Sequence, residues 1–129
     1  MQYRTLGRTG LKVSLLSLGT GGPSKLGQDA GLEQRDQTAL VCRALDLGVN
    51  LFDTSVGYGE SESILGREFK DVPRDTYMLA TKWRYQAQEG RVADPAELIA
   101  QWSGACDDST QITSTLCSST GYWSRSMQR

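Results

Sequence analysis

The chain has 129 residues, enough for one modest domain. Its formal net charge is -1, and its charged residues form no basic stripe, so we expect neither a nucleic-acid partner nor binding to an anionic membrane surface. No apolar run approaches the ~20 residues of a membrane span, and the N-terminal segment lacks the apolar core of a signal peptide. A cytoplasmic protein is therefore expected.

Cysteine and histidine usage narrows the possible chemistry. The three cysteines, Cys42, Cys106 and Cys117, are odd in number and lack the spacing of metal ligands, so inert thiols are the favoured interpretation. Histidine is absent, which removes the commonest general base and metal ligand. We expect no metal site.

The N-terminal segment carries a hairpin pattern. Two short alternating runs, QYRTL at 2–6 and LKVS at 11–14, flank the turn sequence GRTG. A short apolar strand, LLSLGT at 15–20, follows and ends in Gly19 and Thr20.

Helices and strands then alternate along the chain. Residues 35–47 place apolar residues at helical spacing, and Gly48 follows as a stop signal. VNLFD at 49–53 predicts the next strand, 60–70 a second helix, and TYMLATK at 76–82 a third strand. Strand ends recur roughly one βα unit of ~30 residues apart, which favours an α/β fold with a parallel sheet or barrel.

A third helix is expected to begin near Asp94. Asp94 suits the N-cap, Pro95 the first helical position, and Glu97 completes a capping box. The apolar pattern of this helix is lost soon afterwards. Residues 102–129 contain 11 serines and threonines, against 13 in residues 1–101, which is typical of a disordered tail.

Three side chains with complementary chemistry fall at one edge of the expected sheet. Asp53 ends one strand, Lys82 ends the next, and Tyr58 lies in the loop that leaves the first. Neighbouring parallel strands lie ~4.8 Å apart, and their carboxyl ends form the edge where such folds place active sites. An ammonium beside a tyrosine makes the phenol a stronger acid, and a carboxylate holds the ammonium in place. The trio therefore indicates proton transfer at a carbonyl oxygen.

Each residue also has an ordinary interpretation. Asp53 alone suits a strand-end residue that caps the following loop, Tyr58 a half-buried aromatic, and Lys82 a solvated lysine. Their shared position at corresponding strand ends favours the functional interpretation.

Three segments, YRTLGRTGLKVSLLSLGT, NLFDTSVGYGESESILG and YMLATKW, resemble the aldo/keto reductase family over residues 2–101. The resemblance implies a (β/α)8 TIM barrel whose bottom is closed by a β-hairpin. It also implies an oxidoreductase that uses NADPH, less often NADH, to interconvert carbonyls and alcohols. In that family Tyr58 would donate the proton, Lys82 would tune it and Asp53 would support Lys82. Gly19, Thr20 and Asp53 would line the cofactor side of the pocket.

The sequence departs from that family in two ways. The family's fourth catalytic residue is a histidine, and this chain has none. A barrel of this type needs eight βα units and ~250 residues, whereas residues 1–101 supply the hairpin and about three units. We therefore expect an incomplete barrel, present as an N-terminal fragment, followed by a non-family tail at 102–129.

A frameshift is one explanation of the tail. Codons exist for residues 101–121 in which one inserted G after codon 101 gives QVERSLRRLNTDYIDALQFHG, which resembles the family's continuation and restores a histidine. Three functions stay open: a carbonyl reductase with a small-molecule substrate, whose activity is doubtful without histidine; a cofactor-binding regulatory subunit without enzymatic activity; and a non-functional frameshift product. The oligomeric state is not readable.

Overall fold

The computed structural model describes residues 1–83, 94–97, 99–100 and 115–119. Near the N-terminus, β1 (Tyr3–Thr5) and β2 (Lys12–Ser14) pair antiparallel, within the two runs expected to form a hairpin. In the described part of the chain, no helix is long and apolar enough to cross a membrane.

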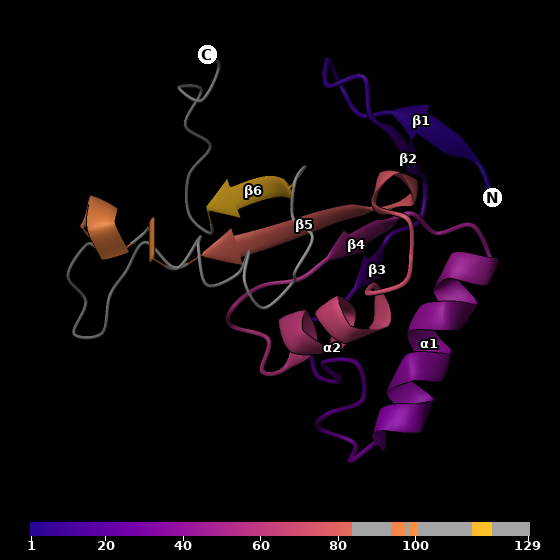
Figure 1. The fold of residues 1–129 in the computed structure, drawn as a ribbon, viewed down its shortest axis with the longest axis vertical. Helices are drawn as coiled ribbons and strands as arrows, with labels where there is room; N and C mark the ends of the chain where they lie inside the picture. Colours follow the sequence, from indigo (N-terminus) through magenta and orange to yellow (C-terminus); the bar gives the residue numbers. More distant parts are fainter. Residues whose placement is uncertain (84–93, 98, 101–114, 120–129) are drawn as a thin grey trace.

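A parallel sheet forms the centre of the described structure, with strand order β3-β4-β5-β6 (Figure 1). Its strands are β3 (Leu18–Gly19), β4 (Leu51–Asp53), β5 (Met78–Trp83) and β6 (Thr115–Ser119). The connecting helices are α1 (Gln34–Asp46), α2 (Ser61–Glu68) and the short 3-10 helix η1 (Arg74–Thr76). The alternating α/β architecture is the one predicted from the sequence.

Helix α1 begins and ends within one residue of the predicted range 35–47. Its inward face carries Val41 and Ala44, both buried. After the helix, the chain reverses at Gly48, whose φ of +82° is readily adopted by glycine, and the Gly48 amide donates to the Leu45 carbonyl.

Aromatic packing ties the sheet to α2. The Phe52 and Phe69 rings meet edge to face with centroids 4.8 Å apart, and the Tyr77 ring lies tilted against Phe69 with centroids 4.1 Å apart. Burial raises the pKa of Tyr77, although the nearby Arg74 guanidinium acts in the opposite direction. The buried cluster consists of Leu26, Val41, Ala44, Phe52, Ile64, Leu65, Phe69, Tyr77 and Leu79. Each fully buried large apolar side chain contributes roughly 1.5–3 kcal/mol to stability.

The sheet register separates core residues from polar ones. Phe52 lies opposite Leu79, and both belong to the buried cluster on the helix side. Asp53 lies opposite Ala80, one residue further along each strand, and so faces the other side. Lys82 lies two residues beyond Ala80 and shares that face.

The helix expected from Asp94 has the predicted cap. The Asp94 amide donates to Glu97 Oε2 at 2.9 Å, and the Glu97 amide donates to Asp94 Oδ1 at 2.9 Å. Residues 95–97 and 99–100 are helical. The capping box is confirmed.

Strand β6 differs from the disorder expected for residues 102–129. Residues 115–119 pair in parallel with residues 79–83 of β5. Ladder pairing uses backbone N–H and C=O groups, so a strand can form without the apolar alternation that reveals strands in a sequence. The remainder of that expected tail lies outside the described residues.

Candidate functional site

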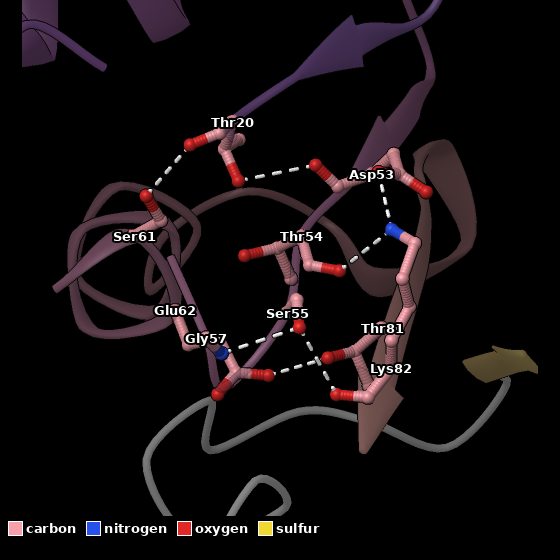
Figure 2. A network of polar contacts seen from close by, with 9 residues as sticks. All are labelled: Thr20, Asp53, Thr54, Ser55, Gly57, Ser61, Glu62, Thr81 and Lys82. Carbon is pink, nitrogen blue, oxygen red and sulfur yellow. Dashed lines mark hydrogen bonds and ion pairs between the residues drawn. The ribbon is translucent and has the colours of Figure 1, made fainter. Parts of the chain in front are cut away.

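The carboxyl ends of β4 and β5 bring Asp53 and Lys82 into direct contact. Lys82 Nζ donates to Asp53 Oδ1 at 2.5 Å and to the Thr54 carbonyl oxygen at 3.1 Å (Figure 2). The lysine side chain is 16% exposed, whereas the aspartate side chain is 40% exposed. The ammonium is therefore held by two oxygens at a largely buried position, and the carboxylate stays open to solvent.

Tyr58 lies beside this ion pair. Lys82 Nζ stands 5.2 Å from the centroid of the half-buried Tyr58 ring, within the range of a cation–π contact. A Cβ added to Gly21 would fall 2.6–2.9 Å from atoms of the same ring, so this glycine lets the backbone approach the phenol closely. The structure thus brings together the three residues proposed from sequence as catalytic.

The loop after β4 is fastened to the end of β5. The Thr54 amide donates to the Ala80 carbonyl at 2.7 Å, and Ser55 Oγ donates to the Lys82 carbonyl at 3.4 Å. Ser55 Oγ also accepts from the Gly57 amide at 3.2 Å (Figure 2). These bonds hold the loop that follows Asp53 against the end of β5, and the same loop places Tyr58 beside Lys82.

Gly19 and Thr20, predicted to line the cofactor side, occupy different environments. Gly19 is exposed, and a Cβ added there would meet no atom within 4 Å. Thr20 is fully buried; its amide and Oγ1 both donate to the Asp53 carbonyl, at 2.9 and 3.1 Å. Gly19 therefore has space for a ligand, while Thr20 fixes the backbone that carries the Asp53 carboxylate.

Several polar residues of this region were not found by sequence reasoning. Thr81 Oγ1 donates to Glu62 Oε1 at 2.5 Å on the helix side of the sheet, and Ser61 Oγ donates to the Thr20 carbonyl at 2.9 Å (Figure 2). Gln28, from the loop between β3 and α1, bonds to the Tyr58 loop. In the sequence, Thr81 and Ser61 stand out only as polar residues next to apolar positions of a strand and a helix. No sequence pattern singles out Gln28.

The arrangement suits proton transfer to or from an oxygen. The phenol is a proton donor or acceptor, the ammonium beside it supplies positive charge, and the carboxylate holds that ammonium in place. The exposed Gly19 and the solvent-accessible Asp53 leave room for a ligand at this edge of the sheet.

Comparison with known proteins identifies related chains. A model of the aldo/keto reductase family matches residues 16–109, which extends past the boundary at 101 expected from composition. L-galactose dehydrogenase of Arabidopsis thaliana is 45% identical over 87 residues, or 64% of this chain and 26% of that protein. A Schizosaccharomyces pombe protein described as a voltage-gated potassium channel beta subunit is 39% identical over 84 residues, 62% of this chain and 24% of its own length.

Solved structures of aldo-keto reductases have a similar fold. The holo form of an aldo-keto reductase from Bacillus halodurans superposes with a TM-score of 0.73 at 27% identity, covering 92% of this chain and 40% of the other. This chain thus spans about a quarter of the length of the curated relatives it matches and less than half of the similar solved chains. On the strength of the family match over residues 16–109, the chain belongs to the aldo/keto reductase family.

Proposed function

We propose that this chain carries the tyrosine, lysine and aspartate part of an NADPH-dependent oxidoreductase site that interconverts aldehydes or ketones and alcohols. The observation that carries the proposal is the ion pair between Lys82 and Asp53, 2.5 Å long, with the Lys82 ammonium beside the Tyr58 ring. A charged pair at the carboxyl ends of two strands, beside a tyrosine ring, suits a tyrosine that exchanges a proton with a substrate. The proposed setting is the N-terminal portion of a (β/α)8 barrel in the cytoplasm, with β1 and β2 closing its bottom.

Tyr58 is the proposed proton donor in the reducing direction. Its O–H bond breaks as the proton passes to the carbonyl oxygen of the substrate, and the oxidation of an alcohol reverses this transfer. Lys82 stabilises the phenolate that remains, because its ammonium is held beside the ring by the Asp53 carboxylate and the Thr54 carbonyl. Asp53 therefore acts through Lys82 and not on the substrate.

The nicotinamide end of the cofactor fits the exposed part of this edge. Gly19 has open space above it, and Asp53 presents a carboxylate that is 40% exposed. When bound, NADPH supplies the hydride for the carbonyl carbon; NADH is the alternative donor. Thr20 has no exposed surface for contact with a ligand, and it supports the site through its two hydrogen bonds to the Asp53 carbonyl.

Fluorescence titration with NADPH, followed by reduction of a probe such as 4-nitrobenzaldehyde, tests the proposal. We expect binding with slow turnover, because the chain has no histidine to complete the family's catalytic set. Tyr58→Phe should lower turnover at least ~100-fold and leave binding intact, since loss of a general acid costs 10²–10⁴-fold. Tyr3→Phe, far from the site, is the matched control. Equal turnover by the wild type and Tyr58→Phe would refute the catalytic role.

A cofactor-binding regulatory subunit is the second candidate. The similarity to the protein described as a potassium channel beta subunit favours it. In that case NADPH would bind with no measurable turnover, and Tyr58→Phe would change nothing in the reduction assay. A partner protein would then be the relevant ligand instead of a carbonyl substrate.

A frameshifted reading of the chain after residue 101 is the third proposal. In the shifted reading, positions 115–119 become DALQF and a histidine follows directly. Strand β6 occupies these same positions as the fourth parallel strand, the place after which the family's histidine is expected. Sequencing the gene at codons 101 and 102 is decisive, because codons incompatible with the shifted reading exclude it.

A further inference from the structure

One glutamine connects the loop between β3 and α1 to the loop that carries Tyr58. Gln28 Nε2 donates to the Lys25 carbonyl at 2.6 Å and to Ser61 Oγ at 3.0 Å, and it lies 3.3 Å from the Tyr58 carbonyl oxygen. Its Oε1 accepts from the Glu60 amide at 2.9 Å. A single half-buried amide thus touches Tyr58 and the two positions that begin α2.

The loop that presents Gln28 has an unfavourable backbone. Lys25 and Leu26 have φ values of +44° and +58°, and Gly27 follows at +81°, so three successive residues are left-handed. Residues other than glycine avoid this region, and they keep it only where the surroundings hold them there. Leu26 is 5% exposed and belongs to the buried cluster, which supplies that restraint. These three residues come directly before Gln28, so the turn presents the Gln28 side chain to the Tyr58 loop.

The Tyr58 loop is shaped to receive this side chain. Gly59 has a φ of +61°, and a Cβ added there would fall 2.5 Å from Gln28 Oε1. The N-terminus of α2 has no side-chain cap of its own: Glu60 at the N-cap position makes no such bond. Gln28, which lies in another part of the chain, caps the helix instead by accepting from the Glu60 amide.

We propose that Gln28 is a positioning residue for Tyr58. By holding the Tyr58 carbonyl, the Glu60 amide and Ser61 Oγ together, it fixes the short segment on which the phenol stands. The ring is thereby kept over Gly21 and beside the Lys82 ammonium. The consequence for catalysis rests on the proposed function, but the positioning itself does not.

The competing explanation is a helix cap with no effect on the phenol. Both roles involve the Glu60 amide, but only positioning requires the donation from Nε2 to the Tyr58 side of the loop. Gln28→Glu separates them, because it keeps an oxygen for the Glu60 amide and loses the amide hydrogens. Gln34→Ala, at an exposed glutamine of α1, is the matched control.

The test uses NMR of the full chain with 13C-labelled tyrosine, without cofactor or substrate. We expect Gln28→Ala to weaken the NOE between the Tyr58 ring and the Gly21 Hα several-fold and to speed exchange of the Glu60 amide. NOEs between β4 and β5 should persist, which separates a local effect from unfolding. Gln28→Glu should lose the ring NOE while keeping the Glu60 amide protected, and Gln34→Ala should match the wild type.

Two results would overturn the proposal. One is an unchanged NOE between Tyr58 and Gly21 in Gln28→Glu, which would leave Gln28 as a cap alone. The other is loss of that NOE in Gln34→Ala as well. If Gln28→Ala unfolds the chain, Gln28→Glu decides the matter by itself. Because no turnover is measured, failure of the reductase proposal would not affect the result.

Discussion

Replacing Tyr77 by phenylalanine should make the chain more stable. The Tyr77 residue is 2% exposed, and its hydroxyl oxygen has no hydrogen-bond partner among the described residues. Its favourable contacts belong to the ring, which stacks 4.1 Å from Phe69 and lies under the Arg74 guanidinium at 4.8 Å. Phenylalanine keeps these ring contacts and removes the unsatisfied group.

Two opposing terms set the magnitude. A buried polar group without a partner costs about 1–3 kcal/mol. Removing one oxygen forfeits a few dispersion contacts of roughly 0.1–0.2 kcal/mol each, in total about 0.5 kcal/mol. We therefore expect Tyr77→Phe to raise the free energy of unfolding by about 1 kcal/mol at neutral pH.

The gain from this substitution should increase at high pH. Burial raises the pKa of Tyr77 in the folded chain above the unfolded value of about 10, with Arg74 opposing the shift. Between these two pKa values the unfolded chain releases the phenol proton and the folded chain keeps it. The stability linked to this group is therefore complete below about pH 10 and is lost as the pH rises through the folded pKa. Phenylalanine has no proton to release, so this loss disappears.

Urea unfolding followed by far-ultraviolet circular dichroism measures both effects, provided that the slope m is the same for each variant. Tyr3→Phe is the matched control, because the Tyr3 hydroxyl donates to the Gly48 carbonyl at 2.9 Å. That variant should lose about 1 kcal/mol, the usual contribution of one hydrogen bond. A loss for Tyr77→Phe as large as that for Tyr3→Phe would refute the reasoning, since it would mean that the buried hydroxyl is satisfied.

Two further substitutions test the packing at the site and the helix after β5. Gly21→Ala should displace the Tyr58 ring, because the new Cβ would fall 2.6–2.9 Å from ring atoms, while the Gly21 backbone has no positive φ that would itself strain an alanine. A changed Tyr58 ring signal in NMR checks this. Gly19→Ala, with open space around it, should leave the signal unchanged. Asp94→Ala removes the Oδ1 acceptor of the Glu97 amide and should cost the helix about 1 kcal/mol, seen as faster hydrogen exchange at residues 96, 97, 99 and 100 with unaltered exchange in α1.

Most elements of residues 1–83 could be predicted because their periodicity and their stop signals agree, but the 3-10 helix η1 (Arg74–Thr76) was not among the expected elements. The range 35–47 differs from the observed α1 by one residue at each end, since Gly48 ends the helix in both descriptions. The capping box at Asp94 was predictable because its bonds join residues three positions apart. Strand β6 was not, because its pairing with β5 depends on the backbone of a distant segment and not on its own pattern.

The site divides in the same way. Asp53 and Lys82 could be placed together from strand order alone, since both lie at the carboxyl ends of neighbouring parallel strands. The role of Gln28 could not be predicted. Gln28 contacts Tyr58, 30 residues away, through a turn of three successive left-handed residues. No rule of sequence spacing predicts such a turn or the contact it makes.

The site depends on which face of the sheet each side chain of β5 points to. Successive side chains of a strand point to opposite faces, so Thr81 and Lys82 lie in different environments. Thr81 is 2% exposed and bonds to Glu62 on the helix side, whereas Lys82 reaches Asp53 on the other. A slip of one residue in the pairing with β4 would exchange these faces and move the Lys82 ammonium away from Asp53 to the helix side of the sheet. The buried pair Phe52 and Leu79 opposes that slip, because it would also turn Leu79 away from the core. The residues that stabilise the sheet therefore also determine which β5 side chain stands beside the tyrosine.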